Sequence, residues 1–351
     1  MENQYKHETA KFLALTIAQI IALTIMVLTV AAPFVMYQQQ SLAQQQQQSL
    51  SNQTIFDIER RPVEDLSFEI DNMIFSHHTA SVNGIQMHYV IGGQGEPIVL
   101  IHGWPQTWYE WHKVMPALAK NYTVIAPDLR GLGDSSKPVT GYDGNTTAED
   151  IYQLVSQLGL GQKIYLVGHD VGVLTAYSYA ASHPNNVSKL VILDVPPLPP
   201  PGFEDCCWWF RFHQTPDIPE MLTAGKEREY LSWFYRYAYN PAAITQADID
   251  EYVSKYSAPG GMRAGFEYYR AFPTTLEQNE DHANVKLQMP VLALGGEYSF
   301  GTAALDSMKS LATDVRGGTV PLSGHWIAEE RPDFLTEQLF KFFGNSTTIG
   351  S

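Results

Sequence analysis

A single carboxylate stands between two glycines in the segment Val167-Gly168-His169-Asp170-Val171-Gly172. An apolar, β-branched run precedes it at Ile164–Val167, and a helical pattern with small residues follows from Val171 to Ser182. A strand, a Gly-x-X-x-Gly turn and a helix form the arrangement in which a nucleophile stands clear above a sheet. A carboxylate there can attack a carbon electrophile and form an alkyl ester. Asp is also common at ordinary strand-to-helix turns, so the hexapeptide alone leaves both interpretations open.

A candidate general base lies far downstream, in Ser323-Gly324-His325-Trp326. The unperturbed pKa of His, near 6.5, suits the activation of water at neutral pH. Upstream, one apolar strand leads into His102-Gly103-Trp104-Pro105 and another leads into Asp128–Ser135. These three segments and the turn at Asp170 together resemble the α/β-hydrolase family, in which the nucleophile comes first and the His last. The other ten His residues, His102 included, are expected to be structural.

The resemblance also implies an oxyanion hole and an acid that orients His325. The backbone N–H groups of Trp104 and Val171 are the expected oxyanion donors, because one follows His-Gly and the other follows the nucleophile. Asp194 ends the strand Val187–Leu193, and fluoroacetate dehalogenases and Cif-type epoxide hydrolases carry their acid at that position. We therefore expect Asp194 to orient His325.

The alternative acid is Glu297, which follows the strand Val291–Leu294. That is the usual place for the acid in the family. Many relatives carry an Asp two residues after this Glu, and this chain has Ser299 there. The substitution favours Asp194 and leaves Glu297 as the second choice.

The region before residue 289 contains the candidate proton donors. Gly265–Ala271 resembles the segment that holds the ring-opening Tyr of epoxide hydrolases, and Tyr269 is the matching position. A phenol can hydrogen-bond an epoxide oxygen and give it a proton. Trp209 stands where Cif-type enzymes have a second ring-opening His and other epoxide hydrolases a Tyr. Because indole donates a hydrogen bond but no proton, His213 and Tyr235 are alternative donors.

Dehalogenases with the same machinery are the main competing interpretation. Fluoroacetate dehalogenases carry Arg one and four residues after the nucleophile, where this chain has Val171 and Leu174, and a halide-site His where it has Trp208. Haloalkane dehalogenases carry an Asn after His-Gly, where this chain has Trp104. The pattern favours hydrolysis of epoxides to vicinal diols through an Asp170 ester, with a haloacid or haloalkane dehalogenase as the alternative. A catalytically inactive, membrane-tethered interaction domain is the second alternative, which the intact catalytic residues disfavour.

The elements that must position these groups alternate between strand and helix. This alternation predicts an α/β-hydrolase fold, a mostly parallel sheet covered on both faces. The predicted strands are Thr79–Val82, Ile85–Val90, Pro97–Ile101, Thr123–Pro127, Ile164–Val167, Val187–Leu193, Val291–Gly295 and Gly318–Leu322. The predicted helices are Trp108–Lys120, Thr147–Leu158, Val171–Ser182, Thr302–Ala312 and Pro332–Phe343.

The alternation breaks between residues 195 and 288, after the sixth core strand. A Pro-rich segment leads into aromatic helical regions at Trp208–Asn240, Asp248–Tyr256 and Arg263–Ala271. Ligands of such sheets bind at the carboxyl ends of the strands, so this helical cap would cover the site. The predicted domains are therefore 57–194 and 289–344 for the core, 195–288 for the cap and 345–351 for a tail.

The N-terminal region predicts a membrane segment. No residue from Phe12 to Tyr37 is charged, and about 20 apolar residues suffice to span a bilayer. The run exceeds the roughly 7–15 residues of a signal-peptide core, which favours a transmembrane signal anchor over a cleaved signal peptide. Lys6 and Lys11, in the polar tail 1–11, place the N-terminus inside, so the catalytic domain would be membrane-anchored or secreted and extracytoplasmic. A Gln/Ser-rich linker follows at 38–56.

Composition limits the partners. The 351 residues are 44% hydrophobic, enough for one large domain with an insertion. The net charge of −15, without a basic block, argues against nucleic acid. The only cysteines, Cys206 and Cys207, are adjacent and are expected to be buried and inert. No zinc cluster or phosphate loop is visible, so no metal or cofactor is expected. The expected partner is a small epoxide, with the oligomeric state open and a dimer allowed.

Overall fold

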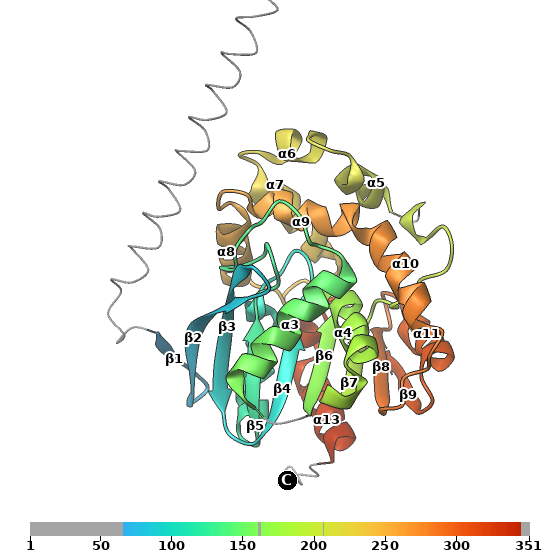
Figure 1. Cartoon of the computed structure of the whole chain (residues 1–351). Helices are drawn as coiled ribbons and strands as arrows, with labels where there is room; N and C mark the ends of the chain where they lie inside the picture. The colour runs from blue at the N-terminus through green and yellow to red at the C-terminus, as the bar shows by residue number, and fades with distance from the viewer. Residues whose placement is uncertain (1–65, 161–162, 206, 345–351) are drawn as a thin grey trace, which may run out of the picture. The chain divides into compact units, whose positions relative to one another are not determined.

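A single, mainly parallel sheet forms the centre of the molecule, as predicted (Figure 1). The computed structural model describes residues 66–160, 163–205 and 207–344. Within them the strand order is β1-β2-β3-β5-β4-β6-β7-β8-β9. β1, β2, β3 and β5 pair antiparallel, and all pairs from β5 to β9 are parallel. The strands span Ser67–Ile70 (β1), Met73–Val82 (β2), Ile85–Gly93 (β3), Glu96–Ile101 (β4), Tyr122–Pro127 (β5), Ile164–His169 (β6), Val187–Leu193 (β7), Val291–Gly296 (β8) and Val315–Val320 (β9).

Helices cover both faces of the sheet, because alternate strand residues point to opposite sides. In β4, Val99 and Ile101 join the apolar cluster under α3 and α4, whereas Ile98 and Leu100 join the cluster on the α13 side. Figure 1 shows α3 and α4 on the near face of the sheet. The core helices are α2 (Met115–Ala119), α3 (Gly144–Leu158), α4 (Val171–Ser182), α11 (Ala303–Leu311), α12 (Ile327–Glu330) and α13 (Pro332–Phe343), with short 3₁₀ turns η2 (Trp108–Trp111) and η3 (Pro184–Asn186).

The insertion between β7 and β8 is helical and lies at the carboxyl ends of the strands (Figure 1). It follows β7, which is the sixth of the predicted strands, because the structure has one more strand, β1, than the sequence predicted. The insertion contains η4 (Phe203–Asp205), α5 (Trp208–Gln214), α6 (Ile218–Thr223), α7 (Glu227–Phe234), η5 (Tyr235–Tyr237), α8 (Gln246–Tyr256), α9 (Gly261–Arg270) and α10 (Phe272–His282).

Several predicted element boundaries were wrong for local reasons. The helix predicted from Thr147 begins at Gly144, because the Asp143 side chain accepts a hydrogen bond from the N–H of Thr146 and caps it. The helix predicted over Trp108–Lys120 is two elements, η2 and α2. Pro116 lies in the first turn of α2, where a missing N–H is tolerated, and so marks a helix start.

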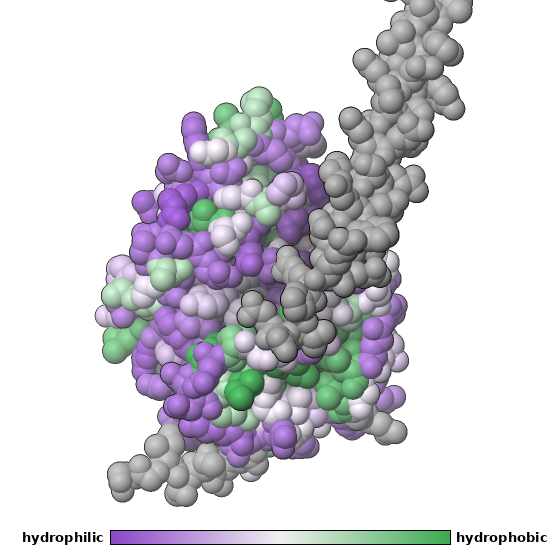
Figure 2. Space-filling model, turned by 90° about the vertical axis from the view of Figure 1, so that its left-hand side faces the viewer, coloured by the Kyte–Doolittle hydropathy of each residue, from purple (hydrophilic) through white to green (hydrophobic). Residues whose placement is uncertain are grey.

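The N-terminal predictions lie outside the described residues. This holds for the membrane segment 12–37, the linker 38–56, the start of the core domain at 57–65 and the tail 345–351. None of the helices in the described part of the chain combines the length and the apolar character that crossing a bilayer requires. Figure 2 shows the β1–β2 edge, where hydrophilic residues predominate in the upper part and apolar residues gather lower down. Exposed Ile74 of β2 contributes to the apolar surface of the molecule.

Candidate active site

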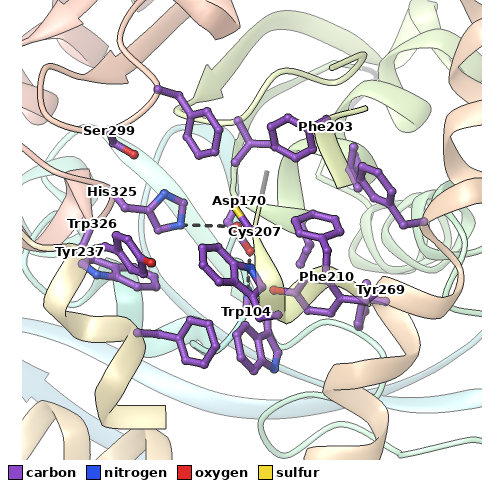
Figure 3. Close-up of a pocket in the computed structure, with 18 of the residues that line it drawn as sticks. Trp104, Asp170, Phe203, Cys207, Phe210, Tyr237, Tyr269, Ser299, His325 and Trp326 are labelled. Atoms are coloured by element: carbon purple, nitrogen blue, oxygen red, sulfur yellow. Dashed lines mark hydrogen bonds and ion pairs between the residues drawn. The ribbon is translucent and has the colours of Figure 1, made fainter. Parts of the chain in front are cut away.

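Asp170 occupies a sharp turn between β6 and α4 (Figure 3). Its φ of 52° and ψ of −127° are rare for a residue with a side chain, and such backbone is found where the surrounding structure enforces it. Neighbouring glycines make room for the turn. A Cβ on Gly103 would lie 2.3 Å from the Cβ of Asp170, and one on Gly172 would lie 2.5 Å from the His102 carbonyl oxygen. The turn therefore presents the carboxylate above the end of β6.

Two backbone N–H groups contact this carboxylate. The N–H of Trp104 donates to Asp170 Oδ1 over 2.9 Å, and the N–H of Val171 also hydrogen-bonds the Asp170 side chain. These are the two donors that the sequence predicted for the oxyanion hole. Because they already point at the carboxyl group, they could stabilise the negative oxygen that forms when water attacks an ester there.

His325 lies between two carboxylates. Its Nε2 is 3.4 Å from Asp170 Oδ2, and its Nδ1 is 2.6 Å from Asp194 Oδ2. Asp194 is fully buried at the end of β7, where its Oδ1 also accepts the N–H of Gly296 over 2.8 Å. The hydroxyl of Ser299 donates to Asp194 Oδ2 over 2.7 Å. Ser299, which stands where many relatives have an Asp, thus hydrogen-bonds the Asp194 carboxylate that His325 contacts.

Glu297, the alternative acid, lies elsewhere. Its side chain is exposed and accepts a hydrogen bond from the N–H of Leu322 over 3.0 Å. It has no contact with His325 in the part of the chain that the structure describes. The structure therefore brings Asp170, His325 and Asp194 together and leaves Glu297 in a turn.

Burial and charge oppose one another at these groups. Burial raises the pKa of Asp170, but the hydrogen bond and charge of His325, aided by His169 and the Val171 N–H, outweigh it, so this pKa is lowered. Burial lowers the pKa of His325, but hydrogen bonds and charges of Asp170 and Asp194 raise it to about 10. The resting site at neutral pH is thus an imidazolium between two carboxylates.

A cavity of about 320 Å³ opens above Asp170. Its wall is mostly aromatic and aliphatic, and none of the described residues that line it is Lys or Arg. Val171 and Leu174 of α4 line it beside the carboxylate, and Phe210 and Phe234 line it from the cap. Such a wall suits a neutral, apolar ligand.

Tyr269 of α9 is the candidate proton donor of the cap. The residue is 6% exposed, and Figure 3 shows its hydroxyl pointing toward Asp170. Burial, and then the charge of Asp170, raise the pKa of this phenol well above its usual value. The hydroxyl therefore stays protonated at neutral pH.

Of the other cap donors that the sequence proposed, only Trp209 of α5 lines the cavity. His213 is fully buried behind the rings of Trp104 and Tyr269, and its Nε2 lies 2.5 Å from the Tyr230 hydroxyl. Tyr235 points away because its hydroxyl donates to the Pro105 carbonyl over 2.9 Å. His213 and Tyr235 were therefore wrongly placed at the cavity, since the helix period alone does not tell which face of a cap helix meets it.

Cap tyrosines also hold the segment after Trp104. Tyr256 of α8 donates to the carbonyl of Gln106 over 2.9 Å, as Tyr235 does to that of Pro105. The Gln106 side chain donates to Tyr252 over 3.1 Å and to buried Glu329 over 2.7 Å. The loop that supplies one oxyanion donor is thus bonded to the cap.

Several residues of the wall escaped the sequence analysis, among them a tyrosine and a cysteine of the cap. Tyr237, from η5, lines the cavity, and so does Cys207, which is half-buried rather than buried as expected. Nothing in the local sequence distinguishes either from its neighbours. Their positions depend on how the cap packs onto the core.

One cluster has ligand atoms close enough for a metal ion. Ligand atoms of His88, Asp128 and Asp134 lie within 4.8 Å of one another. They already have partners, since His88 Nδ1 is 2.7 Å from Asp128 Oδ2 and Lys255 Nζ is 2.8 Å from Asp134 Oδ2. The ammonium group of Lys255 thus supplies a positive charge to this cluster.

Comparisons with known proteins agree with this geometry. Residues 96–332 match the family model described as the alpha/beta hydrolase fold. A soluble epoxide hydrolase from Corynebacterium sp. (strain C12) is 41% identical over 279 residues, which cover 76% of this chain and 97% of that protein. A fluoroacetate dehalogenase from Burkholderia sp. is 28% identical, covering 78% of this chain and 95% of its own length.

Solved structures lead to the same family. The Cif epoxide hydrolase from Acinetobacter nosocomialis is 29% identical and superposes with a TM-score of 0.72 over 76% of this chain and 88% of its own. The family match spans well over half of the chain, and the 41% identity extends over nearly all of a curated relative. This protein is therefore an enzyme of the α/β-hydrolase family, in the branch that includes the epoxide hydrolases.

Proposed function

We propose that this enzyme hydrolyses epoxides to vicinal diols through an ester on Asp170. The observation that carries the proposal is a carboxylate, rather than a hydroxyl, at the turn where the nucleophile stands. A carboxylate ester is a useful intermediate only when the substrate carbon is an electrophile such as an epoxide or a carbon–halogen centre. Tyr269 facing Asp170 across the cavity supports the epoxide.

The first step is the attack of Asp170 on an epoxide carbon. The carbon–oxygen bond breaks, the ring oxygen takes the hydroxyl proton of Tyr269, and an ester forms. The Tyr269 phenolate regains a proton that ultimately comes from the His325 imidazolium. This transfer is favourable at that moment, because the ester carries no charge and no longer raises the pKa of His325.

The second step is hydrolysis of the ester. Neutral His325 takes a proton from water, and the hydroxide attacks the carbonyl carbon of the ester. The N–H groups of Trp104 and Val171 stabilise the oxyanion, which collapses to release the diol and regenerate the Asp170 carboxylate. His325 again carries the proton, so the site returns to its resting charge. Asp194 keeps the ring of His325 oriented throughout.

Dehalogenation is the competing function, and the cavity wall argues against its haloacid form. A haloacid would bring a carboxylate next to Asp170, and the described lining offers no Lys or Arg to pair with it. Burying such an unpaired charge is costly. Val171 and Leu174, which line the cavity, extend the apolar surface instead. The proposed substrate is therefore a neutral epoxide with an apolar body.

Isotope labelling tests the proposal. The full chain is given styrene oxide in less than stoichiometric amount, in water enriched in heavy oxygen. We expect the label to enter the peptide that contains Asp170, because water attacks the ester carbonyl. Label confined to the diol in the first turnover would rule out attack by the carboxylate. Turnover of chloroacetate with no reaction of aromatic or aliphatic epoxides would instead make the enzyme a dehalogenase.

We also propose that residues 12–37 anchor the enzyme, with the catalytic domain outside the cytoplasm. The support is the uncharged run itself and the lysines before it. The protein should remain in membranes after alkaline carbonate washing, and protease added to intact cells should release the domain. A soluble product that begins near Gln44 would show a cleaved signal peptide instead.

A further inference from the structure

His169, the residue before Asp170, is buried between two oxygen atoms. Its Nε2 lies 2.8 Å from the backbone carbonyl oxygen of His325. Its Nδ1 lies 2.9 Å from Glu110 Oε1. Both side chains are almost completely inaccessible, with 1% and 2% of the His169 and Glu110 side chains exposed. The sequence analysis gave Glu110 no role and expected His169 to be structural.

The two contacts determine where the protons are. A carbonyl oxygen only accepts, so Nε2 must carry a hydrogen. Nδ1 lies 2.9 Å from Oε1, where an unprotonated nitrogen would turn its lone pair toward a carboxylate oxygen, so the contact is an ion pair between an imidazolium and a carboxylate. The other carboxylate oxygen, Glu110 Oε2, accepts the N–H of Gly103 over 3.1 Å, as an anion does. A buried ion pair thus lies directly beneath Asp170.

This pair contacts all three segments of the candidate active site. Glu110 belongs to η2 and bonds the N–H of Gly103, the residue before the oxyanion donor Trp104. His169 ends β6, precedes the nucleophile and bonds the carbonyl of the base His325. The register of the sheet explains why the segments after β4 and β6 lie close together, because Ile101 at the end of β4 pairs with Gly168 of β6.

We propose that Glu110 and His169 form a buried ion pair that positions the oxyanion loop and His325 and holds a fixed positive charge beside Asp170. Both are positioning residues, since neither touches the cavity. The role in the reaction rests on the proposed ester at Asp170. The existence of the ion pair does not, and the two can be tested separately.

The fixed charge has a consequence for the pH dependence of the first step. The groups that face the pair are Asp170 and His325 on the His169 side, and Glu329 and Tyr252 on the Glu110 side. Burial lowers the pKa of His169, but the charge and close contact of Glu110 and the charge of Asp170 together outweigh burial and raise it. His169 in turn lowers the pKa of Asp170. Without this charge the pKa of Asp170 rises, so the acidic limb of the alkylation rate moves to higher pH.

Glu110→Gln removes the charge and keeps the shape. The amide oxygen can still accept the Gly103 N–H, and the amide N–H₂ can donate to Nδ1 of a neutral His169, whose Nε2–H still reaches the His325 carbonyl. We expect the acidic limb of single-turnover alkylation to shift upward by about one pH unit, the size of a charge effect at short range in protein. The rate above that limb should change less than about tenfold, because the hydrogen bonds remain.

Two variants serve as controls. Glu329→Gln changes another buried glutamate near the oxyanion loop that contacts neither Asp170 nor His325, and its acidic limb should match the native enzyme. Burial raises the pKa of Glu329 to about 8, so glutamine resembles its neutral form at the pH of the limb. Glu110→Asp keeps the charge with a shorter reach, so it should lower the plateau rate while leaving the limb near its native pH.

Nitrogen NMR of histidine-labelled full chain tests the ion pair without any reaction. We expect imidazolium shifts for His169 in the native enzyme and neutral shifts in Glu110→Gln, with the signal assigned through its loss in His169→Asn. A neutral His169 in the native enzyme overturns the inference, and so does a Glu110→Gln rate that falls equally at every pH. A charged His169 in a protein that forms no Asp170 ester would overturn the proposed function and leave the ion pair standing.

Discussion

The floor and the roof of the cavity are built from different kinds of group. On the floor, Asp170, Asp194 and His325 are ionised, and hydrogen bonds from backbone or side chains hold each one. In the roof, Phe210, Phe234 and Trp209 present apolar faces, and the Tyr269 hydroxyl is the polar group aimed at the floor. The steps in which charge develops need polar groups that are already held in place. Binding the apolar part of a substrate needs an apolar wall with few polar groups.

His325→Gln tests the floor most severely and should have the largest effect. The ester should form and then persist, because no base activates water, so turnover should fall on the order of 10⁴-fold or more. Intact-mass spectrometry should show the protein plus one substrate. The double variant Asp170→Asn/His325→Gln should gain no mass, and a mass gain in it would place the ester on another residue.

Asp194→Asn should have the next largest effect, and it separates the two carboxylates proposed for the acid. Ester hydrolysis should slow by about 10⁴-fold, as when an orienting acid is lost and the imidazole takes the wrong tautomer. Alkylation should remain measurable, so the two steps can be followed separately by stopped-flow and mass spectrometry. Glu297→Gln, which affects only a turn, should behave as the native enzyme. The opposite pattern would assign the role to Glu297.

Tyr269→Phe tests the roof. Alkylation by an epoxide should slow by roughly 10²–10⁴-fold, because the ring oxygen would leave without a proton. Tyr268→Phe is the matched control, since Tyr268 also lines the cavity but its hydroxyl donates to the Arg130 carbonyl. That variant should lose stability rather than rate. Equal losses in both variants would mean that the roof contributes shape alone.

Trp209→Phe should have the smallest effect. An indole N–H can strengthen the hold on the ring oxygen by one hydrogen bond, which is worth about 0.5–1.5 kcal/mol, or roughly a two- to tenfold change in rate. Trp208→Phe, on the exposed side of the same helix, should leave the rate unchanged. A loss for Trp209→Phe as large as that for Tyr269→Phe would make the indole an equal partner in ring opening.

The same contrast explains what the sequence could predict. Residues of the floor lie at strand ends, and a strand end is recognisable from a local apolar run followed by a short motif. Asp170, His325 and Asp194 were therefore found, and the parallel order of the strands brought them together. The roof depends on which face of each cap helix turns inward, so His213 and Tyr235 were misplaced and Tyr237 was missed.

Glu110 and His169 show a second limit. Nothing near Glu110 in the chain marks it as a partner of a residue 59 positions away, and the pairing follows only from the register of β4 against β6. A buried charge of this kind has no sequence motif, because its counterion is distant in the chain and comes near only when the chain folds. The sequence therefore predicts groups that meet the substrate better than groups that support them.

The tyrosine hydroxyls that bond the carbonyls of Pro105 and Gln106 restrict how ligands are exchanged. Swinging the cap away as a rigid lid would strip both carbonyls of their donors, at about 1–3 kcal/mol for each group left unpaired. Passage of substrate and diol should therefore rely on rotation of side chains at the mouth, such as exposed Tyr298 and its stacked neighbour Tyr239. Amide hydrogens of α8 should then exchange with solvent as slowly as those of the central strands, even while the enzyme turns over.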